Sequence, residues 1–493
     1  MGRVLSGLLL TLVLAALVVP LGLYAGPPVL AALANKQPQR QEPVPAYQQA
    51  PLQLGAAGPA FPAPAGLSAP LPAAGELAAL LDAELMVAGS GEFHGTVLDA
   101  LTGEVLYDRA GTTPVMPASS LKILTAAAAL SSLGAETRFE TTVVAGDEPG
   151  TVVLTGGGDV LLGSGASQPE EVVGHAGLQD LAEETAKALD EAAAGAPETV
   201  RILVDDTLFT GPVLSPAWNI DDVEAGEAAA LYPLAINSAW ATEGTQYGPR
   251  TDDAALAAAE AFGQALGAAA AGYGITVDPV IERGTAGGGA ERLAAVESAT
   301  VGEQVRQMLL ISDNYLAEAL ARMTALANGG EGSYDGGTQA ILSTVSGLGV
   351  DTASMVLADA SGLGAGTEIS TRQLARTVQA ALTSDNNDLR GLASSLPVAG
   401  LSGTLSNRFD DAGLEDFTED ADGALAVPET AAGLVRAKTG TLFAVTSLSG
   451  FVTDADGRLL AFAFVADGLD ANTAQARAAV DAAAAVLASC GCR

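Results

Sequence analysis

Two of the chain's four lysines, Lys122 and Lys438, stand in short patterns that could activate a serine hydroxyl. Ser119 precedes Lys122 by three residues, and residues three apart share one face of a helix. A serine hydroxyl is a poor nucleophile unless a nearby base takes its proton, and a desolvated lysine near other positive charge can be neutral and serve as that base. Taken alone, the same Ser-x-x-Lys pattern is also typical of a helix N-terminus with an exposed lysine.

Two further patterns offer matching polar groups. The run from Lys438 to Thr441 reads Lys-Thr-Gly-Thr and leads into a predicted strand. Its lysine supplies a fixed cation, its threonines supply hydroxyls, and its glycine leaves room for a substrate to approach the backbone. Ser312-Asp313-Asn314 opens a predicted helix and supplies a hydroxyl and a carboxamide. Because a lone Ser-Asp-Asn is typical of a helix cap, the functional interpretation depends on all three patterns occurring in this order.

The composition argues against several other kinds of site. The 493 residues include 58 Asp and Glu against 22 Lys and Arg, a formal net charge of −36. Such a surface repels phosphate backbones, so we expect no nucleic-acid partner. With only His94, His175, Cys490 and Cys492 available, we predict no metal site, no cofactor and no disulfide scaffold. We expect both histidines to be structural. Because cysteines one residue apart would close a strained ring, we expect a free or intermolecular thiol.

Ser-x-x-Lys, Ser-Asp-Asn and Lys-Thr-Gly, in this order, are the motif set of the penicillin-binding proteins and serine β-lactamases. The 193 residues from Ser119 to Ser312 exceed the compact β-lactamase pattern, which implies an insertion between the first two motifs. The chain resembles the class C low-molecular-mass penicillin-binding proteins, the D-alanyl-D-alanine carboxypeptidase/endopeptidase family of the PBP4/DacB type (peptidase family S13). The segments that support this branch lie within residues 76–489 and are Leu154–Asp159, Val204–Phe209, Asp359–Leu363, Leu396–Gly400 and Gly403–Leu405.

The resemblance implies a catalytic role for the first two motifs. Ser119 attacks the carbonyl between two D-alanines at the end of a peptidoglycan stem peptide and becomes an ester, while Lys122 takes its proton. Ser312 relays a proton toward the leaving amine, and Asn314 orients the substrate amide and the lysine. Water then hydrolyses the acyl-enzyme. A β-lactam antibiotic is implied as a covalent inhibitor that acylates the same serine and is released slowly.

The third motif is implied to bind the substrate. Lys438 supplies a positive field and, with Thr439 and Thr441, holds the terminal carboxylate of the substrate, with Gly440 between them. The backbone amides of Ser119 and Thr441 are implied to form an oxyanion hole, in which each donor is worth about 2.7–4 kcal/mol.

Two other functions stay open at this point. A secreted serine β-lactamase would need a carboxylate to activate the deacylating water, and no Glu-x-x-Leu-Asn segment occurs between Ser312 and Lys438. A non-catalytic wall-binding protein could keep the fold, but all three motifs are intact. The carboxypeptidase is therefore the function that the sequence favours.

The expected fold is α+β: a DD-peptidase/β-lactamase-like transpeptidase domain, an antiparallel sheet packed with helices, interrupted by a mostly β insertion. The apolar spacing predicts a helix at 76–81 and another at 119–130. Strands are predicted in the pairs 94–99 with 104–108 and 441–452 with 459–465, and a final helix at 471–489. Strands near both chain ends indicate one antiparallel sheet that both ends assemble.

The predicted domain order follows from these elements. In residues 1–30, Arg3 is followed by an apolar run, which is typical of a signal peptide or a signal anchor. We therefore expect the protein to be exported and to act outside the cytoplasm, in the cell wall, at the membrane or after secretion. Residues 31–75 form a Pro/Ala/Gln-rich linker. The transpeptidase-like domain is expected in two parts, 76–145 and 298–493, around an inserted region at 146–297.

Overall fold

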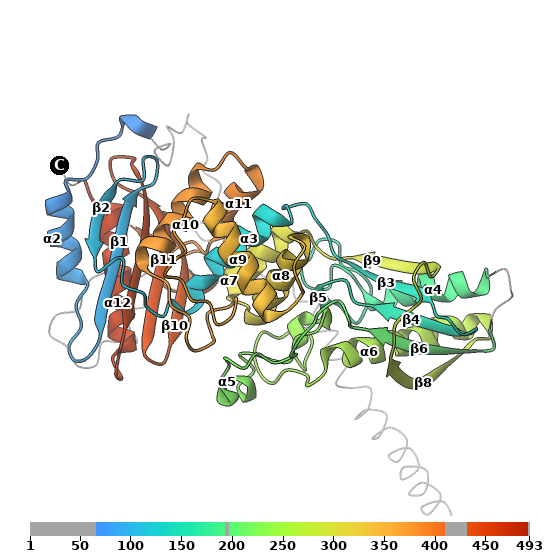
Figure 1. Cartoon of the computed structure of the whole chain (residues 1–493). Coiled ribbons are helices and arrows are strands. Elements are labelled where there is room, and N and C mark those ends of the chain that lie inside the picture. Colours follow the sequence, from blue (N-terminus) through green and yellow to red (C-terminus); the bar gives the residue numbers. More distant parts are fainter. Residues whose placement is uncertain (1–65, 193–196, 410–430, 492–493) are drawn as a thin grey trace, which may run out of the picture. The chain divides into compact units, whose positions relative to one another are not determined.

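The computed structural model describes residues 66–192, 197–409 and 431–491 (Figure 1). The predicted export segment at 1–30 lies outside the described residues, and so does the predicted linker up to residue 65. The described chain has a mixed α+β fold with one antiparallel sheet that carries strands from both ends, as the sequence predicts.

The antiparallel sheet has five strands in the order β10-β11-β12-β1-β2. Its strands are β1 (Glu92–Asp99), β2 (Val105–Arg109), β10 (Arg436–Leu442), β11 (Val445–Thr453) and β12 (Leu459–Asp467). β1 and β12 pair along their length, from Glu92 opposite Asp467 to Asp99 opposite Leu460. This pairing joins the two ends of the described chain in the middle of the sheet.

One predicted strand, 441–452, is two strands in the structure. β10 and β11 pair as an antiparallel hairpin in which Leu442 lies opposite Val445, so the chain reverses at Phe443 and Ala444. The prediction is wrong here because no glycine, proline or asparagine marks this turn. As a result, Lys438 lies inside a strand that begins at Arg436, and the turn carries an exposed Phe443.

Helices cover both faces of this sheet (Figure 1). α2 (Ala74–Glu84) and α12 (Thr473–Ser489) share one apolar core with Phe462 and Phe464 of β12. Ala461, Ala463 and Val465 belong to the core on the other face, because successive side chains of a strand point to opposite sides. The helices of that second core are α3 (Lys122–Ser132), α7 (Val301–Ile311), α8 (Asn314–Ala327), α9 (Tyr334–Gly347), α10 (Thr371–Thr383) and α11 (Asn387–Ser395).

α3 is the central helix of the second core. Every residue from Lys122 to Leu130 is buried, as expected of a helix that is apolar on all sides and is enclosed by other elements. α7, α8, α9, α10 and α11 all contact it. The lysine at its first position is therefore surrounded by protein.

The inserted region has its own five-stranded sheet, with the order β8-β6-β4-β3-β9. β3 pairs antiparallel with β4 and β9, whereas β6 lies parallel to β4 and β8. Two helices pack on this sheet and share its core. The elements are β3 (Glu140–Ala145), β4 (Thr151–Thr155), β5 (Asp159–Leu162), α4 (Leu178–Asp190), β6 (Thr199–Asp205), α5 (Ile220–Glu224), β7 (Leu234–Ile236), α6 (Ala254–Ala270), β8 (Thr276–Arg283) and β9 (Arg292–Glu297).

The first strand of this sheet lies before the expected border at residue 146. β3 ends at Ala145, and both of its partners, β4 and β9, belong to the inserted region. We therefore propose that the inserted region extends from Glu140 to Glu297. Its helices α4 and α6 add to the strands that the sequence indicated at 151–154 and 200–204.

Among the described residues, the stretch Ala254–Tyr273 is long and apolar enough to cross a membrane by length and composition. It consists of α6 and a following 3-10 turn. Phe262 and Leu266 of α6 are buried in the core of the inserted region. One face of this helix therefore packs inside the fold.

Cys490 takes part in a disulfide, and none of the described cysteines is free. The chain's other cysteine, Cys492, lies outside the described residues. The expectation of a free thiol is therefore wrong for Cys490. This residue follows the last residue of α12 and has an extended backbone, so helical geometry no longer restrains the direction of its side chain.

Candidate active site

The predicted nucleophile lies just before α3. Ser119 belongs to a 3-10 turn, Ala118–Leu121, and Lys122 is the first residue of α3. In a 3-10 helix, residues three apart eclipse one another, which brings the two side chains together. Lys122 Nζ donates a hydrogen bond to Ser119 Oγ at 3.0 Å.

Lys122 is fully buried and makes two further hydrogen bonds. Its Nζ donates to Asn314 Oδ1 at 2.6 Å and to the main-chain oxygen of Ser361 at 2.7 Å. An ammonium group has three hydrogens, and these three acceptors match them. The lysine is thus held in one orientation, with one hydrogen directed at the serine.

Burial lowers the pKa of Lys122 from its usual value to about 8. The carboxylates that oppose this shift by favouring the charged form are Asp359, Glu318, Asp313 and Glu227. A pKa near the working pH is what a general base requires, since the group must accept and return a proton. Such a pKa is compatible with the role of base that the sequence predicts for Lys122.

The Ser-Asp-Asn segment forms the corner between α7 and α8. Ser312 follows α7 in a left-handed conformation with φ 62°, and Asp313 caps the N-terminus of α8 by accepting hydrogen bonds from the amides of Tyr315 and Leu316. The capping alternative thus holds for Asp313. The cap leaves its two neighbours, Ser312 and Asn314, free to face the lysines.

Lys438 is the second buried lysine of the site. Its Nζ donates to Ser312 Oγ at 2.9 Å and to the main-chain oxygen of Thr439 at 2.8 Å. Burial lowers its pKa well below the usual lysine value, and the nearby Lys122 and Arg408 lower it further. A substrate carboxylate close to Lys438 would favour the charged form of this lysine and so raise its pKa.

Gly440 is required by packing inside the protein. A Cβ at this position would lie 2.3 Å from Ser447 Oγ and 2.9 Å from both the Ala118 Cβ and the Pro117 oxygen. The expectation that this glycine leaves room for a substrate is therefore replaced by a different reason. Its missing side chain lets β10 lie against the turn that carries Ser119.

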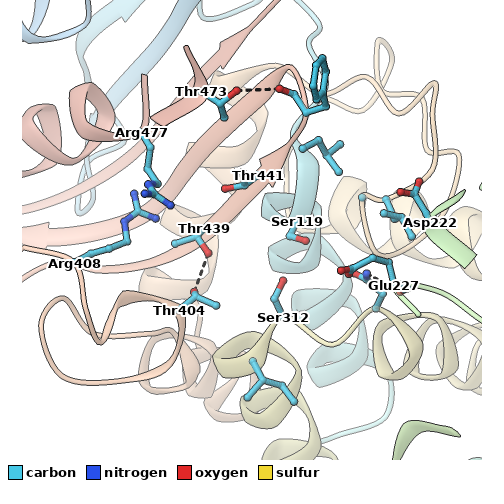
Figure 2. A pocket seen from close by; sticks show the side chains of 16 residues that line it. Ser119, Asp222, Glu227, Ser312, Thr404, Arg408, Thr439, Thr441, Thr473 and Arg477 are labelled. Atoms are coloured by element: carbon cyan, nitrogen blue, oxygen red, sulfur yellow. Dashed lines mark hydrogen bonds between the residues drawn. The ribbon is translucent and has the colours of Figure 1, made fainter. Parts of the chain in front are cut away.

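A cleft of about 780 Å³ opens above these groups. Figure 2 shows Ser119 and Ser312 turned toward each other, with Arg408 and Arg477 on one side and Asp222 and Glu227 on the other. Of the predicted residues, those that line the cleft are Ser119, Ser312, Asn314, Thr439 and Thr441. Lys122 and Lys438 are buried and reach the lining serines by hydrogen bonds.

Several residues of the site had no role in the sequence interpretation. Asp359 and Glu318 are buried near Lys122, and the main-chain oxygen of Ser361 accepts a hydrogen bond from Lys122 Nζ. Asp359 and Ser361 lie in a segment that the family resemblance singled out, so the signal for them was present. Trp218, one of only two tryptophans, donates its indole hydrogen to Asp359, and its rarity could have drawn attention to it.

The two histidines lie elsewhere. His94 is on β1, and its Nε2 lies 3.3 Å from Asp467 Oδ1; His175 follows β5 in a loop, where its Nε2 lies 2.8 Å from Arg138 Nη1. The hydrogen bond to Asp467 raises the pKa of His94. Across the described ranges, no three His, Cys, Asp or Glu side chains are grouped so as to hold a metal ion.

Comparison with known proteins identifies the family. The model of the D-Ala-D-Ala carboxypeptidase 3 (S13) family matches residues 77–247 and 239–489. Carboxypeptidase DacB of Mycolicibacterium smegmatis is 36% identical over 431 residues, which cover 87% of each protein. A carboxypeptidase of Mycobacterium tuberculosis is 37% identical over 405 residues, 82% of this chain and 81% of the relative.

The fold agrees with this relationship. The crystal structure of penicillin-binding protein 4 of Haemophilus influenzae is similar with a TM-score of 0.61. The match covers 83% of this chain and 97% of that chain at 19% sequence identity, so the likeness is one of fold. Taken with the family model and the two carboxypeptidases, it leads to one conclusion: the chain belongs to the D-Ala-D-Ala carboxypeptidase 3 (S13) family.

Proposed function

We propose that the protein is a serine-type D-alanyl-D-alanine carboxypeptidase, with DD-endopeptidase activity, that hydrolyses peptidoglycan stem peptides through a Ser119 acyl-enzyme. The observation that carries this proposal is a pair of hydrogen-bonded groups at the cleft floor, one around each buried lysine. Lys122 contacts Ser119 and Asn314, and Lys438 contacts Ser312. Two buried lysines joined to two cleft-lining serines provide a base, a nucleophile and a proton relay in one place.

In the acylation step, neutral Lys122 Nζ takes the proton of Ser119 Oγ as this oxygen attacks the carbonyl carbon of the scissile amide. The amides of Ser119 and Thr441 donate to the oxyanion that develops. The proton that Lys122 has taken passes through the hydroxyl of Ser312 to the leaving nitrogen, the C–N bond breaks, and Lys122 is neutral again. An ester between Ser119 and the penultimate D-alanine remains.

The substrate's terminal carboxylate lies between Lys438, Thr439 and Thr441 in this proposal. The hydroxyl of Thr439 on β10 is hydrogen-bonded to the hydroxyl of Thr404, with the two oxygens 2.8 Å apart, and this contact fixes its orientation. Arg408 and Arg477 also line this side of the cleft (Figure 2). Arg408 is held by an ion pair with Asp481, and the two guanidinium groups on this side suit an anionic chain end.

In the deacylation step, water attacks the ester carbonyl and gives its proton to Lys122, and Ser119 recovers its own. The same serine would open a β-lactam ring and remain acylated. The structure of the Haemophilus influenzae relative in complex with a β-lactam, similar with a TM-score of 0.58, supports the comparison of folds on which this step rests.

The peptidoglycan stem peptide is the partner that this reaction requires, and it lies outside the cytoplasmic membrane. We therefore propose an extracytoplasmic site of action, in the cell wall, at the membrane or after secretion. The basic and apolar start of the sequence, read as a signal peptide or a membrane anchor, supports this location.

Purified muropeptides test the proposal. The chain from residue 66 onward should release free D-alanine from a pentapeptide monomer and split a D-Ala-linked dimer. The Ser119→Ala variant should do neither. Absence of both products with the wild-type protein would overturn the carboxypeptidase proposal, and rapid turnover of a β-lactam would favour the β-lactamase alternative.

A further inference from the structure

The inserted region hydrogen-bonds two residues near the buried base, Asp359 and Asn314, through two of its own groups. One is the indole of Trp218, and the other is the main-chain oxygen of Glu227. Both come from the segment 217–227, which lies around α5. Each group acts on a different hydrogen-bond acceptor of Lys122. The Glu227 oxygen contacts Asn314 directly, and the indole acts on the main-chain oxygen of Ser361 through Asp359.

Trp218 holds the turn that follows Val356. Its Nε1 donates to Asp359 Oδ2 at 3.0 Å, and the neighbouring Ala217 accepts a main-chain hydrogen bond from Ala365 at 3.1 Å. The indole ring also packs edge-to-face on Tyr334, with ring centroids 5.5 Å apart. The tryptophan is thus fixed on both its polar and its apolar side.

Asp359 is fully buried and organises the turn around its carboxylate. It accepts hydrogen bonds from Ser361 Oγ at 2.8 Å and from the amides of Gly362 and Gly364 at 2.8 and 2.6 Å. In this arrangement the main-chain oxygen of Ser361 faces Lys122 Nζ at 2.7 Å. The position of that oxygen therefore depends on the Asp359 carboxylate.

The second contact orients the carboxamide of Asn314. Asn314 Nδ2 donates to the Glu227 oxygen at 2.9 Å, and a main-chain oxygen can only accept. The amide must therefore direct its nitrogen at Glu227 and its oxygen at Lys122, 2.6 Å away. The contact comes from the main chain, so it is independent of the side chain at position 227.

We propose that the inserted region is a positioning element for the general base: Trp218, acting through Asp359, and the Glu227 main chain fix two of the acceptors that hold Lys122 toward Ser119. This inference rests on the proposed function, because it assumes that Lys122 is the base of acylation. It assigns Trp218 as a positioning residue that acts from outside the cleft lining.

The proposal has an electrostatic consequence. The carboxylates that favour the charged form of Lys122 are Asp359, Glu318, Asp313 and Glu227, and the charge of Lys122 in turn lowers the pKa of Lys438. Asp359 is the first of the carboxylates that favour the charged lysine. The indole hydrogen partly neutralises Asp359, so its removal strengthens the negative potential at Lys122 and makes the lysine harder to deprotonate.

The test is the pH dependence of acylation by a fluorescent penicillin. Trp218→Phe keeps an aromatic ring against Tyr334 and removes the indole hydrogen. On the acid side of the profile (the acid limb), the pH at which the variant's acylation rate is half-maximal should rise by about 0.5–1 unit. A tenfold change in the protonation equilibrium of the lysine corresponds to one pH unit. The acylation rate at pH 7 should fall about 3- to 10-fold and recover at higher pH.

Tyr334→Phe is the matched control. It removes a hydroxyl from the same aromatic pair, the one that donates to the Val213 oxygen, and leaves the Asp359 contact in place. Its pH profile should coincide with the wild-type profile. If Trp218→Phe folds poorly, benzothienylalanine at position 218 keeps the ring shape and replaces only the N–H.

Asp359→Asn gives the opposite sign. Loss of the negative charge below Lys122 should move the acid limb to lower pH. A Trp218→Phe profile that coincides with the wild type, or one that falls equally at every pH, would overturn the inference. Failure of the proposed function would be seen separately, as a wild-type protein that is not labelled or a Ser119→Ala variant that is.

Discussion

The two parts of the molecule both place helices on a five-stranded sheet, yet they contribute differently to the site. The antiparallel part supplies the two buried lysines and their side-chain partners Ser119, Asn314 and Ser312. The inserted part supplies a main-chain oxygen and an indole, and two acidic side chains, Asp222 and Glu227, in the cleft wall. The reactive groups thus come from the antiparallel part, and some of the groups that hold them come from the inserted part.

This difference determines what the sequence reveals. Reactive groups need particular side chains at particular spacings, so they leave a motif. A supporting carbonyl such as that of Glu227 leaves none, since every residue has one. If the comparison holds, loss of a reactive side chain in the antiparallel part abolishes the reaction, while loss of the supporting indole in the inserted part shifts its pH dependence.

The largest effect is expected for the nucleophile. Ser119→Ala removes the oxygen that forms the acyl bond, so covalent labelling by penicillin should fall by at least about 1000-fold. Ser120→Ala is the matched control, because this neighbouring hydroxyl is buried against Ser447 at 2.8 Å and does not line the cleft. Gel fluorescence after timed labelling measures both. Equal labelling of the two variants would contradict the assignment.

The next effect separates the lysines of the two parts. Lys122→Met keeps the length of the side chain and removes the base, so the acylation rate should fall about 100- to 10,000-fold. Lys187→Met makes the same change at an exposed lysine on α4 of the inserted part, where the rate should stay within about twofold of the wild type. Stopped-flow labelling gives both rates, and a comparable loss in Lys187→Met would break the comparison.

A stability effect follows from the buried carboxyl beneath Lys122. Burial raises the pKa of Glu318 to about 8, and the neighbouring Asp359 adds to the shift. Because the folded state holds this proton between about pH 4.5 and 8 and the unfolded state does not, the contribution of Glu318 to stability falls as the pH rises through this range.

Glu318→Gln removes this pH dependence and keeps an oxygen for the amide of Ala360, which now donates to Glu318 at 2.9 Å. Relative to the wild type, the variant should gain about 1–4 kcal/mol in free energy of unfolding between pH 5 and pH 8. Glu183→Gln, at an exposed position of α4, should show no such trend. Urea denaturation at both pH values measures it; a pH-independent difference would mean that Glu318 stays ionised in the fold.

The smallest effect concerns the binding of the chain end. Thr441→Val removes an exposed hydroxyl on β10 and should raise KM about 3- to 10-fold for a peptide that ends in a free carboxylate, since one charge-assisted hydrogen bond is lost. For the same peptide with a terminal amide, the change should be smaller. Thr473→Val, whose hydroxyl instead donates to the Phe443 oxygen, is the control. Steady-state release of D-alanine from the acid, and of D-alanine amide from the amide, gives the two KM values.

Much of the antiparallel part could be predicted from the sequence because its signals are local. A continuous apolar run marks β12, a turn segment between two short β-rich runs marks the β1–β2 hairpin, and the two motif lysines mark the floor of the cleft. The hairpin turn at Phe443 and Ala444 was missed because an unbroken apolar run, 442–445, continues through it. In the inserted part, α4 has buried residues at helical spacing, among them Leu178, Leu181 and Leu189, so this helix could have been predicted from its periodicity.

The support of the base could not be predicted in this way. Trp218 and Asp359 are 141 positions apart, and only folding brings the indole to the carboxylate. The orientation of the Asn314 amide likewise depends on the Glu227 oxygen, 87 positions away. Such pairs have no fixed spacing along the chain, so a single sequence carries no pattern for them.

The central claim is that Ser119 carries the acyl group. Incubation with penicillin, followed by intact-mass measurement and mapping of the proteolytic peptides, tests it most directly. The account predicts a mass increase of one opened penicillin per chain, located on Ser119 and absent after Ser119→Ala. An adduct on another residue, or no adduct on the folded wild-type protein, would contradict it.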